Sequence, residues 1–106
     1  MPAAPIARID IQLREIIPSF FENVRNDVAA IRRALANADM NTARTTSHGV
    51  KGAAAGFGFA ELADMGAALE RGARDNAPPQ ELASLIDAMT RYLDTVCVIY
   101  VDTGEF

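Results

Sequence analysis

His48, Lys51 and Gly52 are the residues of this chain whose types and spacing can do chemistry. Residues three and four apart lie on the same side of a helix, so a helix here places Lys51 and Gly52 one turn from the imidazole of His48. A neutral imidazole can form covalent intermediates in group transfer, and a lysine ammonium can neutralise an anion attached to it. Gly52 leaves room for another macromolecule to approach the ring, although it could instead be a packing glycine between two helices.

The residues around this group are small or polar. Gly49 and Ala55 add to the bare surface, while Arg44 and Thr45 lie one turn before His48, where they either touch a partner or are simply solvated. No carboxylate lies near His48 in the sequence to orient its ring, and no glycine-rich phosphate loop follows a strand. The site is therefore predicted to accept and hold a phosphoryl group, while its donor supplies the activation.

The segment that carries these residues, about 39–56, is predicted to be a helix with an unusually small buried side. The side of its helical wheel opposite His48 carries the predicted buried residues, which are Ala43, Ser47, Val50, Ala54 and Phe57. Each glycine inside a helix costs about 1 kcal/mol relative to alanine. A helix that keeps two glycines beside an exposed histidine therefore favours a functional explanation.

Four main helices are predicted, including the one described above. The first begins at Pro18, and its apolar residues over Ile17–Leu35 recur at spacings of four and three. The third follows a glycine turn and begins at Phe59, and the fourth follows the turn at Pro78–Pro79. Short connections between amphipathic helices indicate an all-α fold, an antiparallel four-helix bundle.

Both ends of the chain require a choice between helix and strand. A short additional N-terminal helix is predicted from apolar residues at spacings of three, four and three, which are Ile6, Ile9, Leu13 and Ile16. The run Val96–Val101 is β-branched, but it is predicted to continue the last helix, because an isolated strand has no partner here. The predicted organisation is a loose N-terminus at residues 1–5, a helical bundle over 6–101 and a frayed tail at 102–106.

Composition excludes several classes of function. The 106 residues carry a net charge of −4, which argues against binding nucleic acid. One cysteine cannot form an internal disulfide, and one histidine with one cysteine gives too few soft ligands for zinc. No apolar run is long enough to span a membrane, and the first residues lack the features of a signal peptide. The sequence predicts a soluble cytoplasmic domain that binds neither nucleic acid nor membrane.

The remaining conspicuous side chains are predicted to be structural. Cys97 is expected to be a small buried apolar residue. Packing in the core or at a bundle end is expected for the four phenylalanines near the helix ends, which are Phe20, Phe21, Phe57 and Phe59.

Residues 18–100 resemble the histidine-containing phosphotransfer (Hpt) domain family. The resemblance rests on a pattern that extends over some twenty residues and on the opening of the histidine helix, and its positions here are Asp39, His48, Lys51, Gly52, Gly58, Leu62 and Leu69-Glu70. Gly49 departs from the pattern, since a polar residue or asparagine is more usual there.

The resemblance implies that His48 accepts a phosphoryl group on Nε2 from a receiver-domain aspartate and passes it to another receiver aspartate. Lys51 would stabilise the phosphate, and Gly52 would permit docking of the receiver. Magnesium would be held by the receiver, so no cofactor is expected on this chain. Response-regulator receiver domains are the implied partners, and a hybrid sensor histidine kinase is a further candidate. Such a domain is a relay intermediate without autokinase activity rather than an enzyme.

A non-catalytic adaptor is the alternative interpretation, in which a degenerate bundle binds receivers or kinases without phosphotransfer. The intact pair of His48 and Lys51 counts against it, and no constellation for an independent active site is present. A monomer is expected, although the apolar C-terminal run could support a dimer. The start at Met1 favours a free-standing carrier over a domain of a hybrid kinase, without deciding between them.

Overall fold

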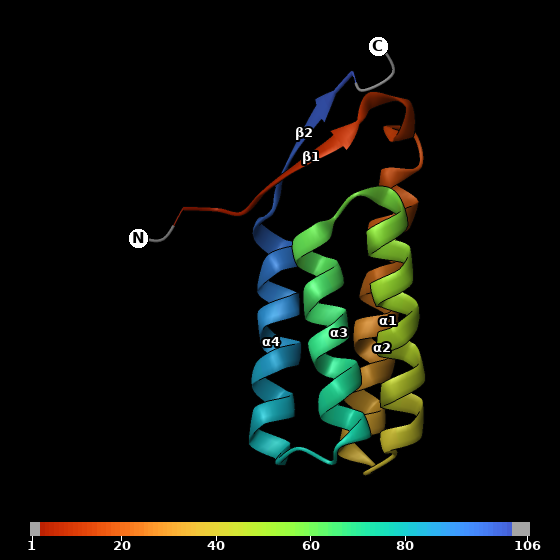
Figure 1. The fold of residues 1–106 in the computed structure, drawn as a ribbon, viewed down its shortest axis with the longest axis vertical. Coiled ribbons are helices and arrows are strands. Elements are labelled where there is room, and N and C mark those ends of the chain that lie inside the picture. The colour runs from red at the N-terminus through yellow and green to blue at the C-terminus, as the bar shows by residue number, and fades with distance from the viewer. Residues whose placement is uncertain (1–2, 103–106) are drawn as a thin grey trace.

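The computed structural model describes residues 3–102, and most of them belong to four helices. Figure 1 shows these helices side by side, with successive helices running in opposite directions. The elements in chain order are β1 (Ile6–Asp10), the 3-10 helix η1 (Ile11–Leu13), α1 (Ile17–Ala36), α2 (Met40–Phe57), α3 (Ala60–Arg74), α4 (Pro79–Thr95) and β2 (Cys97–Val101). The predicted antiparallel four-helix bundle is therefore confirmed, with a small sheet added at one end.

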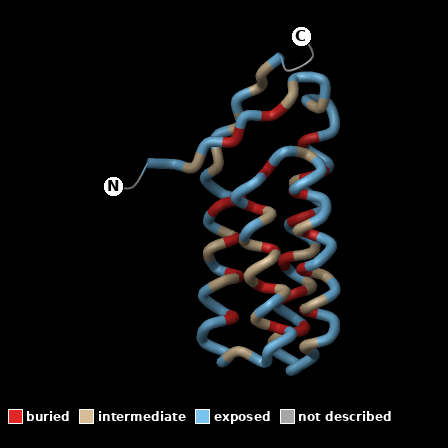
Figure 2. Tube along the Cα trace, viewed as in Figure 1, coloured by how far each residue is buried: buried red, intermediate tan, exposed pale blue. Residues whose placement is uncertain are grey.

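Each helix buries one apolar face in the centre of the bundle, as the distribution of buried residues in Figure 2 shows. The seam predicted for α1 is present, because Ile17, Val24, Val28 and Ile31 are all buried. Burial of an apolar side chain of this size contributes roughly 1.5–3 kcal/mol, so this core supplies the main driving force for folding. None of the helices in residues 3–102 is long and apolar enough to cross a membrane.

A cluster of aromatic rings closes the core at the end that carries the sheet. The rings of Phe20 and Phe59 stack with their centroids 4.9 Å apart, and Phe57 lies at the same distance from Phe20. Phe21 meets Phe20 and Phe59 edge-on. The predicted packing role of the four phenylalanines is thus confirmed, and it fixes the start of α1 against the α2–α3 connection.

The predicted N-terminal helix is wrong, because residues 6–10 form the strand β1. Burial alternates along the strand, with Ala7 and Ile9 buried and Ile6 exposed, which is the period of two of a strand with one covered face. A helix with this apolar face would have buried Ile6 and Ile16, but Ile6 is 58% exposed and Ile16 is 47% exposed. The spacing of the isoleucines matched a helix by coincidence.

The predicted helical continuation over Val96–Val101 is also wrong, because Cys97–Val101 forms β2. The partner that seemed to be missing is β1, with which β2 pairs in parallel from Ile6↔Cys97 to Asp10↔Val101. Cys97 lies on the exposed side of this strand, so the prediction that it is buried is corrected as well. Of the predicted frayed tail only Asp102 is described, and residues 103–106 lie outside the described residues.

Candidate functional site

The ends of α2 are fixed by local sequence. Asp39 caps the N-terminus, where its carboxylate accepts a hydrogen bond from the amide of Thr42 at 3.1 Å. This hydrogen bond lowers the pKa of the Asp39 carboxyl below its ordinary value. Gly58 ends the helix with φ of +95°, a left-handed conformation that glycine adopts without strain. Asp39 and Gly58 therefore determine where the helix that carries His48 begins and ends.

The buried side of α2 is as small as the sequence predicts. Ala43, Ser47, Val50 and Ala54 are buried, and the Ser47 hydroxyl is satisfied by donating to the carbonyl of Ala43 at 2.7 Å. Small side chains allow close packing of helices, and α2 packs most extensively against α3. The buried side thus holds α2 firmly against α3, and His48 lies on the exposed side of the helix.

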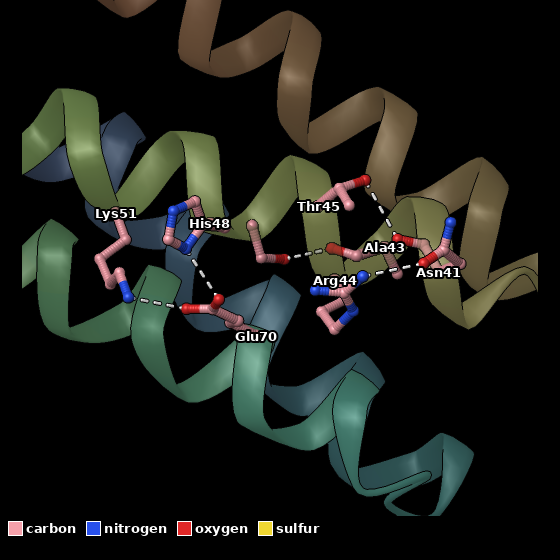
Figure 3. Close-up of polar contacts among 8 residues, drawn as sticks. Asn41, Ala43, Arg44, Thr45, His48, Lys51 and Glu70 are labelled. Carbon is pink, nitrogen blue, oxygen red and sulfur yellow. Dashed lines mark hydrogen bonds and ion pairs between the residues drawn. The ribbon is translucent and has the colours of Figure 1, made fainter.

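Glu70 on α3 connects the two side chains that the sequence singled out. His48 Nδ1 lies 2.8 Å from Glu70 Oε2, and Lys51 Nζ lies 2.8 Å from Glu70 Oε1. Figure 3 shows the Glu70 carboxylate, which extends from α3 and lies between the His48 imidazole and the Lys51 ammonium on α2. The His48 side chain is 63% exposed, whereas the Glu70 side chain is only 19% exposed. The three side chains form a cluster in which the imidazole ring remains open to solvent.

The Glu70 carboxylate determines which nitrogen of His48 is free. Hydrogen bonds from the Lys51 ammonium and from His48 lower the pKa of Glu70 below its ordinary value, so its carboxyl is ionised at neutral pH. An ionised carboxylate only accepts hydrogen bonds, so Nδ1 must be the donor. In the neutral ring Nε2 then carries the lone pair, which is the state that a nucleophile requires. Glu70 therefore orients the ring and selects its tautomer.

This role of Glu70 is not predictable from the sequence alone. No carboxylate lies near His48 along the chain, and Glu70 is marked only as part of the family pattern. The two residues are 22 positions apart and meet only because α3 packs beside α2. The usable signal was the pattern itself, because a glutamate at the end of an amphipathic stretch is otherwise typical of a solvated helix face.

The predicted docking surface on α2 is exposed. Gly49, Gly52 and Ala55 are all exposed, on the side of the helix away from the core. A Cβ added at Gly49 or Gly52 would meet no atom within 4 Å, apart from the adjoining backbone of α2. Gly52 is therefore not a packing glycine between two helices. Gly56 has the same property, so bare surface extends two turns beyond His48.

The side chains of Arg44 and Thr45 form hydrogen bonds within α2. The Arg44 guanidinium donates to the side-chain oxygen of Asn41 at 2.9 Å. The Thr45 hydroxyl donates to backbone carbonyls of the preceding turn, those of Asn41 and Thr42. Neither side chain reaches His48, so the structure does not bring them into the cluster (Figure 3). Across residues 3–102, no three His, Cys, Asp or Glu side chains gather into a possible metal site.

Comparison with protein families agrees with this geometry. The family model for the Hpt domain matches residues 15–96, which is most of the chain. The chain belongs to the Hpt domain family. The match covers α1 to α4 and ends at Val96, before β2 begins. Searches of curated proteins and of solved structures give no match.

Membership of the Hpt family fixes the general class of activity. Hpt domains take part in histidine phosphotransfer in phosphorelays, as carriers rather than as classical enzymes. They interact with receiver domains and kinases of two-component signalling. The exposed histidine on a helix of this bundle has the accessibility that such a carrier needs.

Proposed function

We propose that this Hpt domain carries a phosphoryl group on Nε2 of His48, taken from the aspartyl phosphate of one receiver domain and given to the aspartate of another. The observation that supports it most strongly is the Glu70 carboxylate, which lies 2.8 Å from Nδ1 and leaves Nε2 as the free, solvent-facing nitrogen. Magnesium belongs to the receiver in this proposal, so the chain needs no cofactor of its own.

The transfer step balances without a further reactant. The Nε2 lone pair attacks phosphorus, the bond from phosphorus to the aspartyl oxygen breaks, and the receiver carboxylate leaves. The ring gains positive charge as the bond forms, because Nδ1 keeps its proton. Glu70 accepts the hydrogen bond from that Nδ1–H and stabilises the cation, as a carboxylate does beside the histidine of a catalytic triad. The reverse step returns the phosphoryl group to a second receiver.

Lys51 stabilises the phosphoryl group in this proposal. Its ammonium rests on Glu70 Oε1, and its side chain is 37% exposed, so it can turn toward a phosphoryl group on the neighbouring ring. We expect Lys51→Ala to slow phosphotransfer about ten- to a hundredfold, since a hydrogen bond to a charged group contributes roughly 1.5–3 kcal/mol. The initial rate of transfer from a phosphorylated receiver measures this. Arg33→Ala, which removes a cation from an exposed site on α1, is the matched control. An unchanged rate in Lys51→Ala would remove Lys51 from the mechanism.

The proposed function is tested with phosphorylated receiver domains as donors. We expect radioactive phosphate to move from the receiver to this chain, and the product to be stable in base and labile in acid. The adaptor alternative predicts a complex with the receiver and no transferred phosphate. A panel of receivers that bind but transfer nothing would therefore favour the adaptor.

A further inference from the structure

Gly66 on α3 is buried where this helix packs against the backbone of α2. A Cβ at this position would lie 2.9 Å from the backbone nitrogen of Lys51 and 3.1 Å from its Cα. These are backbone atoms of α2, so they cannot swing aside as the end of a flexible side chain can. The surface glycines of α2 are different, since a Cβ at Gly49 or Gly52 meets nothing within 4 Å.

The contact at Gly66 lies directly beside the charged cluster. Glu70 follows Gly66 by one turn of α3, so both residues lie on the same side of that helix. The backbone touched by Gly66 belongs to Lys51, whose ammonium is one of the two partners of Glu70. The separation of α2 and α3 at Gly66 therefore sets how far the Glu70 carboxylate must reach.

We propose that Gly66 is a positioning residue, which brings α3 close enough to α2 for Glu70 to hold His48 and Lys51 at once. Both contacts of Glu70 are 2.8 Å long, near the short end of the range for hydrogen bonds. A methyl group at Gly66 forces the helices apart by several tenths of an ångström, because packed interiors have no spare room. The carboxylate then loses one or both partners, although neither partner has changed.

Gly66→Ala tests the proposal, and Gly72→Ala is the matched control. The control makes the same substitution in the same helix, where the nearest obstacle is the tip of the Leu82 side chain and not backbone. His48 is the single histidine of the chain, so its ring gives one unambiguous pair of ¹⁵N NMR signals. We expect Gly66→Ala to shift these signals away from the Nδ1–H tautomer and to raise the pKa of Glu70 toward its ordinary value. Gly72→Ala should leave both unchanged.

The effect on phosphotransfer rests on the proposed function and is measured separately. We expect Gly66→Ala to slow transfer roughly three- to tenfold, and to add no further loss when combined with Glu70→Gln. A purely structural defect would slow transfer equally in both backgrounds and would overturn the proposal. Unchanged NMR signals in Gly66→Ala would overturn it too, whether or not phosphate is transferred. Absence of transfer in the unmodified protein would instead contradict the proposed function and leave the NMR result standing.

A stabilised background keeps the test valid if Gly66→Ala alone does not fold. Gly56→Ala replaces an exposed helical glycine whose added methyl meets nothing within 4 Å, so it favours the helix without touching the cluster. Far-ultraviolet circular dichroism verifies that the double variant Gly56→Ala/Gly66→Ala is folded. The NMR signals of this double variant are compared with those of Gly56→Ala alone, with the same expected shift.

Discussion

His48→Gln is expected to abolish phosphorylation of this chain while leaving its fold intact. Glutamine has no nucleophilic nitrogen, and the chain has no second histidine to take over. The imidazole is 63% exposed and its hydrogen bond is to Glu70 outside the core, so its removal takes little from the core. The expected loss is complete, in contrast to the partial losses expected for Lys51 and Gly66.

The measurement pairs transfer from a phosphorylated receiver with a thermal melt. We expect no acid-labile phosphate on His48→Gln and a melting temperature within a few degrees of the unmodified protein, since surface changes usually cost less than about 0.5 kcal/mol. The receiver should still bind, because the bare surface around Gly52 is unchanged. Phosphate retained by His48→Gln would place the acceptor elsewhere and refute the proposed site.

Substitution of Gly52 is expected to separate stability from function. Gly52→Ala should raise the free energy of unfolding by up to about 1 kcal/mol, because alanine favours a helix and its methyl group meets nothing in the chain. Gly52→Leu should fold as well but slow transfer from a receiver tenfold or more, because its side chain occupies the space that a docked partner needs. If both results are obtained, α2 gives up stability at Gly52 in exchange for a surface on which a receiver can dock.

Two donors distinguish docking from chemistry in Gly52→Leu. A phosphorylated receiver has to approach the surface, whereas phosphoramidate is small enough to reach the imidazole without docking. We expect Gly52→Leu to lose transfer from the receiver and to keep phosphorylation by phosphoramidate. Ala29→Leu, at an exposed site on α1, is the control for an added surface leucine. Equal loss with both donors would show that Gly52 supports the chemistry of His48 rather than docking.

The bundle could be predicted from sequence because its information is local. The apolar spacing of α1, the proline at its start and the glycine after α2 each act within a few residues. The sheet could not be predicted in this way, because its pairing joins Ile6 to Cys97, near the two ends of the chain. Neither segment has a pairing partner near it in the sequence, and only the folded bundle brings the two strands together.

The same contrast between local and long-range information applies to the candidate site. His48, Lys51 and Gly52 lie within one turn of one helix, so their spacing alone predicts their common side. Glu70 and Gly66 belong to another helix, and their relation to Lys51 depends on how closely the two helices pack. The proposed nucleophile is therefore predictable from the sequence, while the groups proposed to orient it become visible only in the tertiary structure.

The parallel pairing of β1 and β2 also has a mechanical consequence. Ile6 lies beside Cys97 and Asp10 beside Val101, so the chain enters the sheet at one end and leaves it at the other. Tension between the two ends of the chain would load the strands in shear, so that their backbone hydrogen bonds resist together and do not open one after another. The four helices would carry none of this load until the strands had slid apart. Under such tension the sheet would therefore protect α2, the helix that carries His48, from strain.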